Sequence, residues 1–253
     1  MELIQPDWPA PSRVRAFSTT RSGGVSSGAF ASLNLADHVG DAPADVATNR
    51  ARLRTELELP TEPCWLRQVH GCTIVTASSA QQNCEADGSL ARESGAVCAV
   101  MTADCLPLLF CDERGTSVAA VHAGWRGLAD GVIEMAVATL ALPPEQMLVW
   151  LGPAIGATAF EVGDEVRERF MATDSAAGAA FMPSEINSLT PPRWQADLFL
   201  LARQRLQRLG IERIYGGGDC TFSQPDRFFS YRRDGITGRM ASVIWLAPDT
   251  AAS

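Results

Sequence analysis

The chain has 253 residues, of which 46% are hydrophobic and 20% are charged, so it can bury a sizeable core and does not belong to the disordered class. No apolar run approaches the roughly 18 residues that a membrane span needs, which excludes a helical membrane protein and argues against a membrane partner. The 21 basic and 29 acidic residues give a formal net charge of −8, which would repel a phosphate backbone and argues against a nucleic-acid partner.

The first half of the chain is predicted to contain one strand, one helix and then a series of short strands. Residues 14–19 have the pattern of a strand, the glycine-rich residues 20–26 that of a turn, and residues 44–58 that of a helix. Short apolar runs typical of strands follow at residues 64–69, 72–77, 96–103, 106–111 and 117–122. Strands therefore dominate the middle of the chain.

The second half is predicted to alternate helices and strands. Helices are expected at residues 127–140, 164–171 and 197–209, with Gly210 as the cap of the last. Strands are expected at residues 147–151, 211–215, 228–231 and 241–246. No G-x-G-x-x-G motif follows a strand, so we predict a single α/β domain of the α+β type over residues 1–253, with a mixed β-sheet core flanked by helices rather than a doubly wound Rossmann sheet.

Three compositional features restrict the chemistry. All 21 basic residues are arginines, which excludes a Walker lysine, a Schiff-base lysine and a pyridoxal-phosphate site. The seven cysteines are an odd number in a chain too long to need covalent staples, which favours free thiols or a metal site. The start of the chain lacks a basic segment followed by an apolar one, so we expect no secretory signal and a cytoplasmic location.

Histidine chemistry is restricted to His38, His70 and His122. His70 ends one strand-like run, His122 lies where a strand gives way to a helix, and Cys105 follows Asp104 at a break between two apolar runs. Three strand ends are therefore expected to converge. From the residues alone, Cys105 is a buried small side chain beside structural histidines, or the nucleophile of a Cys–His dyad, or a ligand with both histidines of a zinc ion with an open fourth position.

Seven motifs in order along the chain carry a family resemblance. They lie at residues 18–26 (STTRSGGVS), 32–41 (SLNL and HVGD), 68–71 (QVHG), 102–107 (TADCLP), 122–127 (HAGWRG), 152–156 (GPAIG) and 229–239 (FSYRRD and TGR). With these motifs the chain resembles the laccase-domain or YfiH-like family over essentially its whole length. The resemblance implies a YfiH-like fold and a catalytic metal site made by His70, Cys105 and His122, while His38 is expected to stay outside it.

Members of that family are described as purine nucleoside phosphorylases with adenosine deaminase activity, and earlier as polyphenol oxidases. The resemblance implies a transferase that acts with phosphate on adenosine, inosine and S-methyl-5′-thioadenosine, and a hydrolase that deaminates adenosine. In deamination, water on the zinc, with a pKa lowered to about 7, would supply the hydroxide that attacks C6 of the purine. Asp104 is expected either to transfer the proton to the leaving ammonia or to hydrogen-bond a ligand imidazole.

Phosphate and purine need binding groups of their own. Arginine forks are expected to hold the phosphate, and the candidates are Arg21 in the glycine-rich loop, Arg126 at a helix start, and Arg232 and Arg233. Trp125 has two interpretations, as a platform that stacks on the purine or as a side chain of the core.

Two other functions are attached to the same family. The first is copper-dependent oxidation of phenols, but blue and trinuclear copper centres together need about ten imidazoles, so three histidines leave at most Cu²⁺ at the one site. The second is the editing of peptidoglycan precursors, in which Cys105 as nucleophile or zinc as Lewis acid would hydrolyse an amide.

Overall fold

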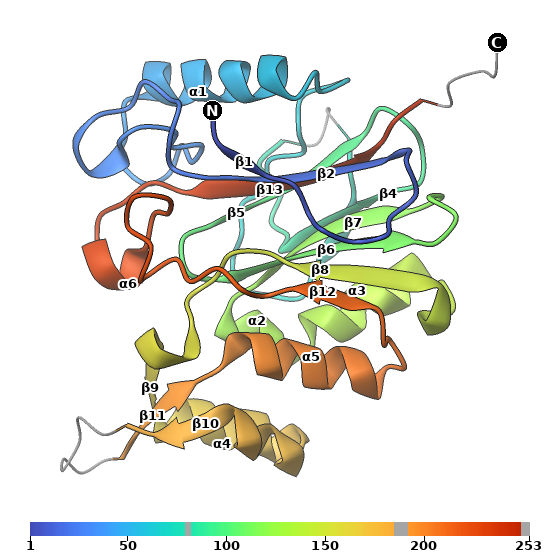
Figure 1. Cartoon of the computed structure of the whole chain (residues 1–253), viewed down its shortest axis with the longest axis vertical. Helices are drawn as coiled ribbons and strands as arrows, with labels where there is room; N and C mark the ends of the chain where they lie inside the picture. The colour runs from blue at the N-terminus through green and yellow to red at the C-terminus, as the bar shows by residue number, and fades with distance from the viewer. Residues whose placement is uncertain (79–81, 185–191, 249–253) are drawn as a thin grey trace.

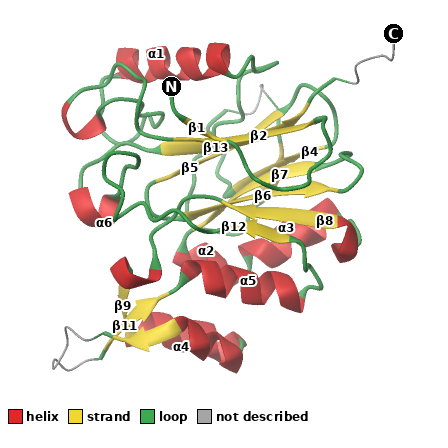
Figure 2. Cartoon of the chain, in the orientation of Figure 1, coloured by secondary structure: helices red, strands yellow, loops and turns green. Residues whose placement is uncertain are grey.

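The computed structural model describes residues 1–78, 82–184 and 192–248. Figure 1 shows their elements in layers, with helix α1 (Pro43–Glu56) over one β-sheet, a second β-sheet below it, and helices α2 (Trp125–Asp130), α3 (Val132–Leu140) and α5 (Leu198–Arg208) beneath the second sheet. In the same orientation, Figure 2 separates the strands of the middle layers from the helices on either side. This is the predicted mixed sheet core flanked by helices.

The sheet under α1 is antiparallel and has the order β1-β2-β13-β5. Its strands are β1 (Leu3–Ile4), β2 (Val14–Thr19), β13 (Met240–Leu246) and β5 (Val97–Thr102). One face of this sheet packs against α1 through buried side chains such as Leu53, Trp65 and Val243. The C-terminal strand thus lies between β2 and β5, which come from the first half of the chain.

The second sheet has the order β12-β8-β6-β7-β4-β3 and is mixed. Its strands are β12 (Ile214–Gly216), β8 (Met147–Leu151), β6 (Leu106–Asp112), β7 (Val118–Ala123), β4 (Gly88–Ala91) and β3 (Ile74–Thr76). The pairs β12–β8 and β3–β4 are parallel and the other pairs antiparallel. β6 and β7 form the central hairpin, in a register that pairs Leu106 with Ala123 and Cys111 with Val118.

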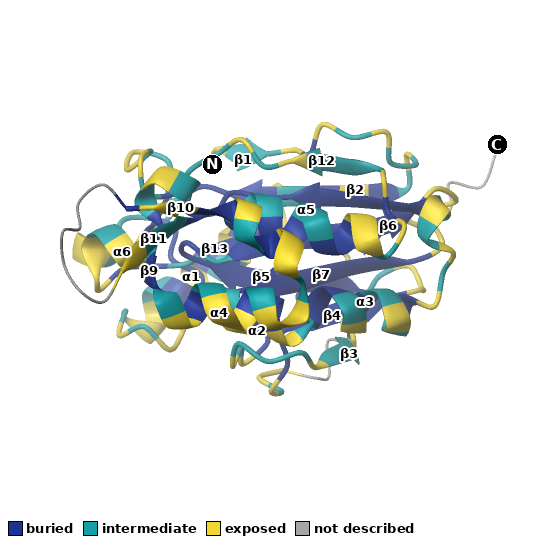
Figure 3. Cartoon of the chain, turned by 90° about the horizontal axis from the view of Figure 1, so that it is seen from below, coloured by how far each residue is buried: buried dark blue, intermediate teal, exposed yellow. Residues whose placement is uncertain are grey.

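The central strands are buried on both faces, as the dark blue strands in Figure 3 show. Along β6, Leu108 and Phe110 face the helices, whereas Leu109 and Cys111 face the other sheet. A strand covered on both sides reads as a continuous apolar run instead of an alternating one. This burial explains why the sequence predicted β5, β6 and β7 within one or two residues of their observed ends.

The remaining elements lie beyond α5 or in the connections. Helix α4 (Asp164–Thr173) packs beside a small antiparallel sheet of β9 (Glu161–Gly163), β11 (Arg193–Ala196) and β10 (Phe181–Pro183). A short helix, α6 (Tyr231–Asp234), precedes β13. The 3₁₀ turns are η1 (Gly28–Phe30), η2 (Pro144–Gln146), η3 (Ala157–Ala159) and η4 (Ser175–Ala180).

Three predicted elements differ from the structure. The helix expected at residues 127–140 is two helices, because Gly131 adopts a φ of 99° between α2 and α3. Residues 64–69 form only isolated bridges and no strand. The apolar residues 228–231 are buried, but Phe228 donates its backbone N–H to Gln224 within a turn, and α6 begins at Tyr231.

The sequence analysis also missed strand β4. Its residues are small or polar, and a Cβ at Gly88 would lie 2.6 Å from Ile74 Cδ1 and 3.0 Å from the carbonyl oxygen of Ala120. Close packing of neighbours therefore selects small residues there rather than the branched ones that signal a strand. Over the described ranges, every helix is too short or too polar to cross a membrane.

Candidate metal centre

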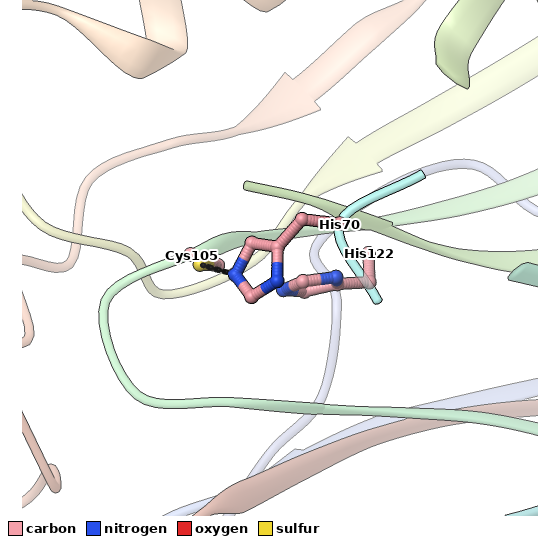
Figure 4. Close-up of side chains that lie close together, drawn as sticks. All are labelled: His70, Cys105 and His122. Atoms are coloured by element: carbon pink, nitrogen blue, oxygen red, sulfur yellow. Dashed lines mark hydrogen bonds between the residues drawn. The ribbon is translucent and has the colours of Figure 1, made fainter. Parts of the chain in front are cut away.

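Three side chains with metal-binding atoms converge where β5, β6 and β7 meet (Figure 4). Cys105 lies in the turn between β5 and β6, His122 near the end of β7, and His70 in the loop that precedes β3. Their ligand atoms lie within 4.8 Å of one another, and Cys105 Sγ is 3.8 Å from His70 Nε2. The two imidazole rings meet edge to face with centroids 4.9 Å apart. The structure thus brings together the three residues that the sequence singled out.

Gln68 fixes the loop that carries His70. Its side-chain amide donates a hydrogen bond to the Met101 carbonyl oxygen at 2.8 Å and accepts one from the Met101 N–H at 2.7 Å, so the loop is tied to β5. His70 has a φ of 60°, in the left-handed region that costs a non-glycine residue about 1–2 kcal/mol. Such strain persists where the surroundings over-determine the backbone, as at functional sites.

Asp87 connects two of the three residues, through the side chain of His122 and the backbone of His70, and was not predicted. Its carboxylate, which is fully buried just before β4, accepts a hydrogen bond from His122 Nδ1 at 2.8 Å. It also accepts backbone N–H groups from Val69, His70 and Gly71, at 3.2, 2.9 and 2.7 Å. Burial raises the pKa of Asp87, but the hydrogen bond and charge of His122 with the backbone donors outweigh it and hold that pKa below its ordinary value.

Two glycines of the motif at residues 122–127 allow the parts of the site to pack closely together. A Cβ at Gly124 would lie 2.6 Å from His70 Cδ2 and 3.1 Å from Cys105 Sγ. A Cβ at Gly127 would lie 2.8 Å from the carbonyl oxygen of Gly71, on the backbone of the His70 loop. Glycine at position 124 therefore leaves room for the side chains of His70 and Cys105, and glycine at position 127 leaves room for the backbone of the His70 loop.

The cluster is charged in a way that suits metal binding. Burial opposes ionisation of the Cys105 thiol, but the charge and hydrogen bonds of His122 and His70 lower its pKa to about 6. Burial likewise opposes the imidazolium of His122, but the Cys105 thiolate and the Asp87 carboxylate raise its pKa to about 9. The thiolate and the imidazolium thus stabilise each other, and the thiolate is the form of cysteine that binds a metal.

A cavity of about 420 Å³ opens onto this cluster. This volume is in the range of small-molecule sites. The residues that line it are His38, Gln68, His70, Met101, Thr102, Ala103, Cys105, His122, Arg126, Tyr231 and Arg239. A larger hollow of about 660 Å³ lies beside α1 and is lined by none of the three potential ligands. The chemistry therefore places the candidate site at the smaller cavity.

Two arginines line the cavity, and only one of them was predicted. Arg126 is exposed, with its guanidinium 4.6 Å from the centre of the Trp125 ring. Arg239 donates to the carbonyl oxygens of Thr237 and Gly238, and burial lowers its pKa although Cys105 and Asp104 oppose this shift. Arg239 belongs to the last motif, so the sequence carried a signal for it.

The other predicted phosphate ligands do not line the cavity. Arg21 donates to the carbonyl oxygens of Ala31 and Pro225. Arg232 donates to the carbonyl oxygen of Glu161, and Arg233 donates to the carbonyl oxygens of residues 221, 222 and 228. These guanidinium groups hold loops together, because they donate hydrogen bonds to backbone carbonyl oxygens. The sequence alone does not show that those oxygens lie beside them.

Trp125 is also placed differently from the substrate-stacking interpretation. Its half-buried ring packs against the apolar core next to α2 and is not part of the cavity wall. The aromatic side chain at the cavity is Tyr231, which is 62% exposed. The core interpretation of Trp125 is thus the one that the structure supports.

The hydrogen bonds of Asp104 go to groups other than the ligand imidazoles. Asp104 has a φ of 92°, and its carboxylate accepts the Thr221 hydroxyl at 2.6 Å and the Arg232 backbone N–H at 2.7 Å. Asp104 thereby fixes the start of α6, which carries Tyr231. The carboxylate that bonds a ligand imidazole is Asp87, for which the sequence offered only a lone aspartate before an unrecognised strand.

His38 is not part of the ligand cluster, yet its exposed ring lines the cavity. Its Nδ1 lies 3.5 Å from Asp37 Oδ1. A titratable side chain that belongs to the HVGD motif thus faces the same space as the potential metal ligands. The sequence analysis expected this histidine to stay outside the metal site and gave no sign that it would line the same cavity.

Comparison with known proteins gives concordant results. The family model described as multi-copper polyphenol oxidoreductase laccase matches residues 15–247. A Pseudomonas aeruginosa protein named purine nucleoside phosphorylase is 55% identical over 243 residues, which cover 96% of this chain and 98% of that protein. An Escherichia coli protein named purine nucleoside phosphorylase YfiH is 53% identical over 246 residues, with coverage of 97% and 99%.

Solved structures agree along the whole chain. A Neisseria meningitidis protein superposes with a TM-score of 0.91 at 47% identity, covering 98% of this chain and all of the other. YlmD from Geobacillus stearothermophilus superposes with a TM-score of 0.85 at 30% identity, covering 98% of this chain and 97% of the other. The predicted YfiH-like fold is thereby confirmed.

Proposed function

The chain belongs to the multi-copper polyphenol oxidoreductase laccase family, and we propose that it is a metal-dependent purine nucleoside phosphorylase that also deaminates adenosine. The observation that carries the proposal is the His70–Cys105–His122 cluster in the wall of a cavity that two arginines also line. The names of relatives that are 55% and 53% identical support the phosphorylase activity.

We propose zinc as the resident ion. One thiolate and two imidazoles with a fourth position for water or substrate are the donor set of a catalytic zinc site, and the described residues contain one such group. Bound there, zinc supplies a Lewis acid and lowers the pKa of a coordinated water. Three histidines are too few for blue and trinuclear copper centres, which need about ten imidazoles, so the multi-copper description of the family does not extend to this chain.

The cavity lining fits phosphorolysis of adenosine, inosine or S-methyl-5′-thioadenosine. In this reaction a phosphate oxygen attacks C1′ of the sugar, and the bond from C1′ to N9 breaks with its electron pair on the purine, which then takes up a proton. Arg126 and Arg239 are the cations that hold the phosphate. Tyr231 offers a ring face to the purine, and the exposed imidazole of His38 is positioned to deliver the proton.

Deamination uses the same cavity without phosphate. Water adds at C6 of adenosine, and the amino group leaves as ammonia. Asp104 is occupied by Thr221 and the backbone of Arg232, so we assign the proton transfer to the titratable groups that line the cavity instead. Phosphate at the two arginines is then not required for the reaction.

The test is an analysis of products by chromatography and mass spectrometry. Zinc-loaded protein with adenosine and phosphate should give adenine and ribose 1-phosphate beside the products of deamination, and without phosphate it should give inosine alone. Two outcomes would overturn the proposal. One is release of an amino acid from a peptidoglycan precursor with no reaction of nucleosides. The other is copper-dependent oxidation of a phenol with no reaction of nucleosides.

A further inference from the structure

Asp87 holds two of the three proposed ligands through one carboxylate. Oδ1 accepts His122 Nδ1–H and the His70 N–H, and Oδ2 accepts the N–H groups of Val69 and Gly71. The carboxylate has no exposed surface. From this geometry we infer that Asp87 is a positioning residue of the metal centre: it fixes the imidazole of His122 and the loop that carries His70.

The contact with His122 selects the ring nitrogen that binds the metal. An ionised carboxylate only accepts hydrogen bonds, so the proton of the neutral imidazole must lie on Nδ1. Nε2 then carries the lone pair, at the side of the ring that faces Cys105 and His70 (Figure 4). Carboxylates that bond a ligand imidazole in this way also raise its basicity.

The contacts with the loop have a separate effect. The N–H groups of three successive residues, 69–71, converge on the carboxylate, and His70 in their centre has a φ of 60°. Charge-assisted hydrogen bonds to this loop stabilise a conformation that L-residues otherwise avoid. Removal of the carboxylate charge is therefore expected to release His70 as well as His122.

The chain offers a matched control in Asp112. This carboxylate is also buried, and it accepts the N–H groups of Arg114, Thr116 and Ser117 and the hydroxyl of Thr116. Asp112 ends β6, whereas Cys105 precedes the first residue of that strand. A change from aspartate to asparagine at either position removes one buried charge from a set of backbone donors, but only at residue 87 does it affect proposed ligands.

The experiment compares Asp87→Asn with Asp112→Asn. The dissociation constant of zinc, measured by competition with a chromophoric chelator, should rise about 10–100-fold in Asp87→Asn and stay unchanged in Asp112→Asn. The visible spectrum of the cobalt-substituted protein should change in the first variant only, while thermal unfolding should show a lower melting temperature in both. Wild-type zinc affinity and cobalt spectrum in a folded Asp87→Asn would overturn the inference.

A second measurement needs no variant. In ¹⁵N spectra of the zinc-loaded protein, His122 should be coordinated through Nε2 and carry its proton on Nδ1, and coordination through Nδ1 would overturn the inference. The inference rests on the proposed metal site but not on the proposed reaction. Because both measurements follow the metal, a wrong assignment of the substrate leaves their outcome unchanged, and a protein that binds no zinc would contradict the proposed function itself.

Discussion

The two ends of the β6–β7 hairpin use the same local device with different results. At the turn, buried Asp112 accepts three backbone N–H groups of residues 114–117 and one hydroxyl. At the open end, buried Asp87 accepts three backbone N–H groups of residues 69–71 and the imidazole of His122. A buried carboxylate orders a loop in both places. The two sets of donors differ in the fourth member, which is the Thr116 hydroxyl at the turn and the His122 imidazole at the candidate metal centre.

The thiols at the two ends of β6 differ in the same way. The pKa of Cys105, beside two imidazoles, is lowered to about 6. The pKa of Cys111 is raised to about 12, first by burial and then by the charge of Asp112. The turn before β6 thus carries a thiol suited to bind metal, whereas the far end of the strand carries a thiol that behaves as a small apolar side chain.

The largest expected effect comes from exchanging these thiols for alanine. Cys105→Ala should remove zinc and lower the rate of phosphorolysis by more than about 100-fold, since even changes behind a ligand cost about 10–100-fold. Cys111→Ala should leave the rate unchanged and lower the free energy of unfolding by about 1–2 kcal/mol through a small cavity. Zinc content by atomic absorption and steady-state rates test both variants. A fully active Cys105→Ala would contradict the assignment of Cys105 as a metal ligand.

The arginines at the two ends give the next largest difference. Arg126→Leu and Arg239→Leu should each raise the KM for phosphate about 10–100-fold, because a charge-assisted contact contributes about 1.5–3 kcal/mol, while deamination continues. Arg213→Leu is the control and should leave the KM for phosphate unchanged, because Arg213 lies at the turn, where its Nη1 is 3.0 Å from Glu113 Oε2. Phosphate saturation curves provide the measurement. Unchanged KM values in both cavity variants would show that Arg126 and Arg239 do not bind the phosphate.

A smaller, pH-dependent difference is expected for alkylation of the metal-free protein. The thiolate of Cys105 is present above its pKa of about 6 and is lost below it, so iodoacetamide should react about tenfold more slowly at pH 5 than at pH 7. Cys111, with a pKa of about 12, should stay unmodified throughout. Peptide mapping by mass spectrometry assigns the sites, and a midpoint for Cys105 above pH 8 would show that the imidazoles do not stabilise its thiolate.

The smallest effect on the metal centre is expected from the turn itself. Gly115 has a φ of 65°, so Gly115→Ala should lower the free energy of unfolding by about 1 kcal/mol and leave the zinc affinity unaltered. The melting temperature would fall by about 3 °C. Calorimetry and chelator competition measure the two quantities, and a coupled loss of zinc affinity would mean that the hairpin ends are not independent.

The sequence predicted the parts of this molecule that local pattern determines. Strands buried on both faces, such as β6 and β8, read directly as apolar runs. The side chains of His70, Cys105 and His122 converge as expected. Strand β4 and its neighbour Asp87 were missed, because close packing favours glycine and serine there and a lone aspartate has no periodicity. Local pattern shows which side chains are present but not which donors surround them.

The arginines illustrate the same limit. Arg21 and Arg233 lie in motifs as prominent as those of Arg126 and Arg239, yet carbonyl groups from other loops bind the first two. Which guanidinium reaches a ligand depends on where the chain places its unpaired carbonyl oxygens. That placement is a property of the tertiary structure.

The register of the central hairpin, in which Leu106 pairs with Ala123, also determines whether the three candidate ligands meet. A slip of two residues would keep every side chain of β6 on its own face and would preserve the apolar layers. It would nevertheless displace Cys105 from His122 by about 7 Å along the strand, more than the 4.8 Å that now contains all three ligand atoms. A metal held by all three side chains would therefore favour the observed register over one that leaves the burial of the apolar side chains unchanged.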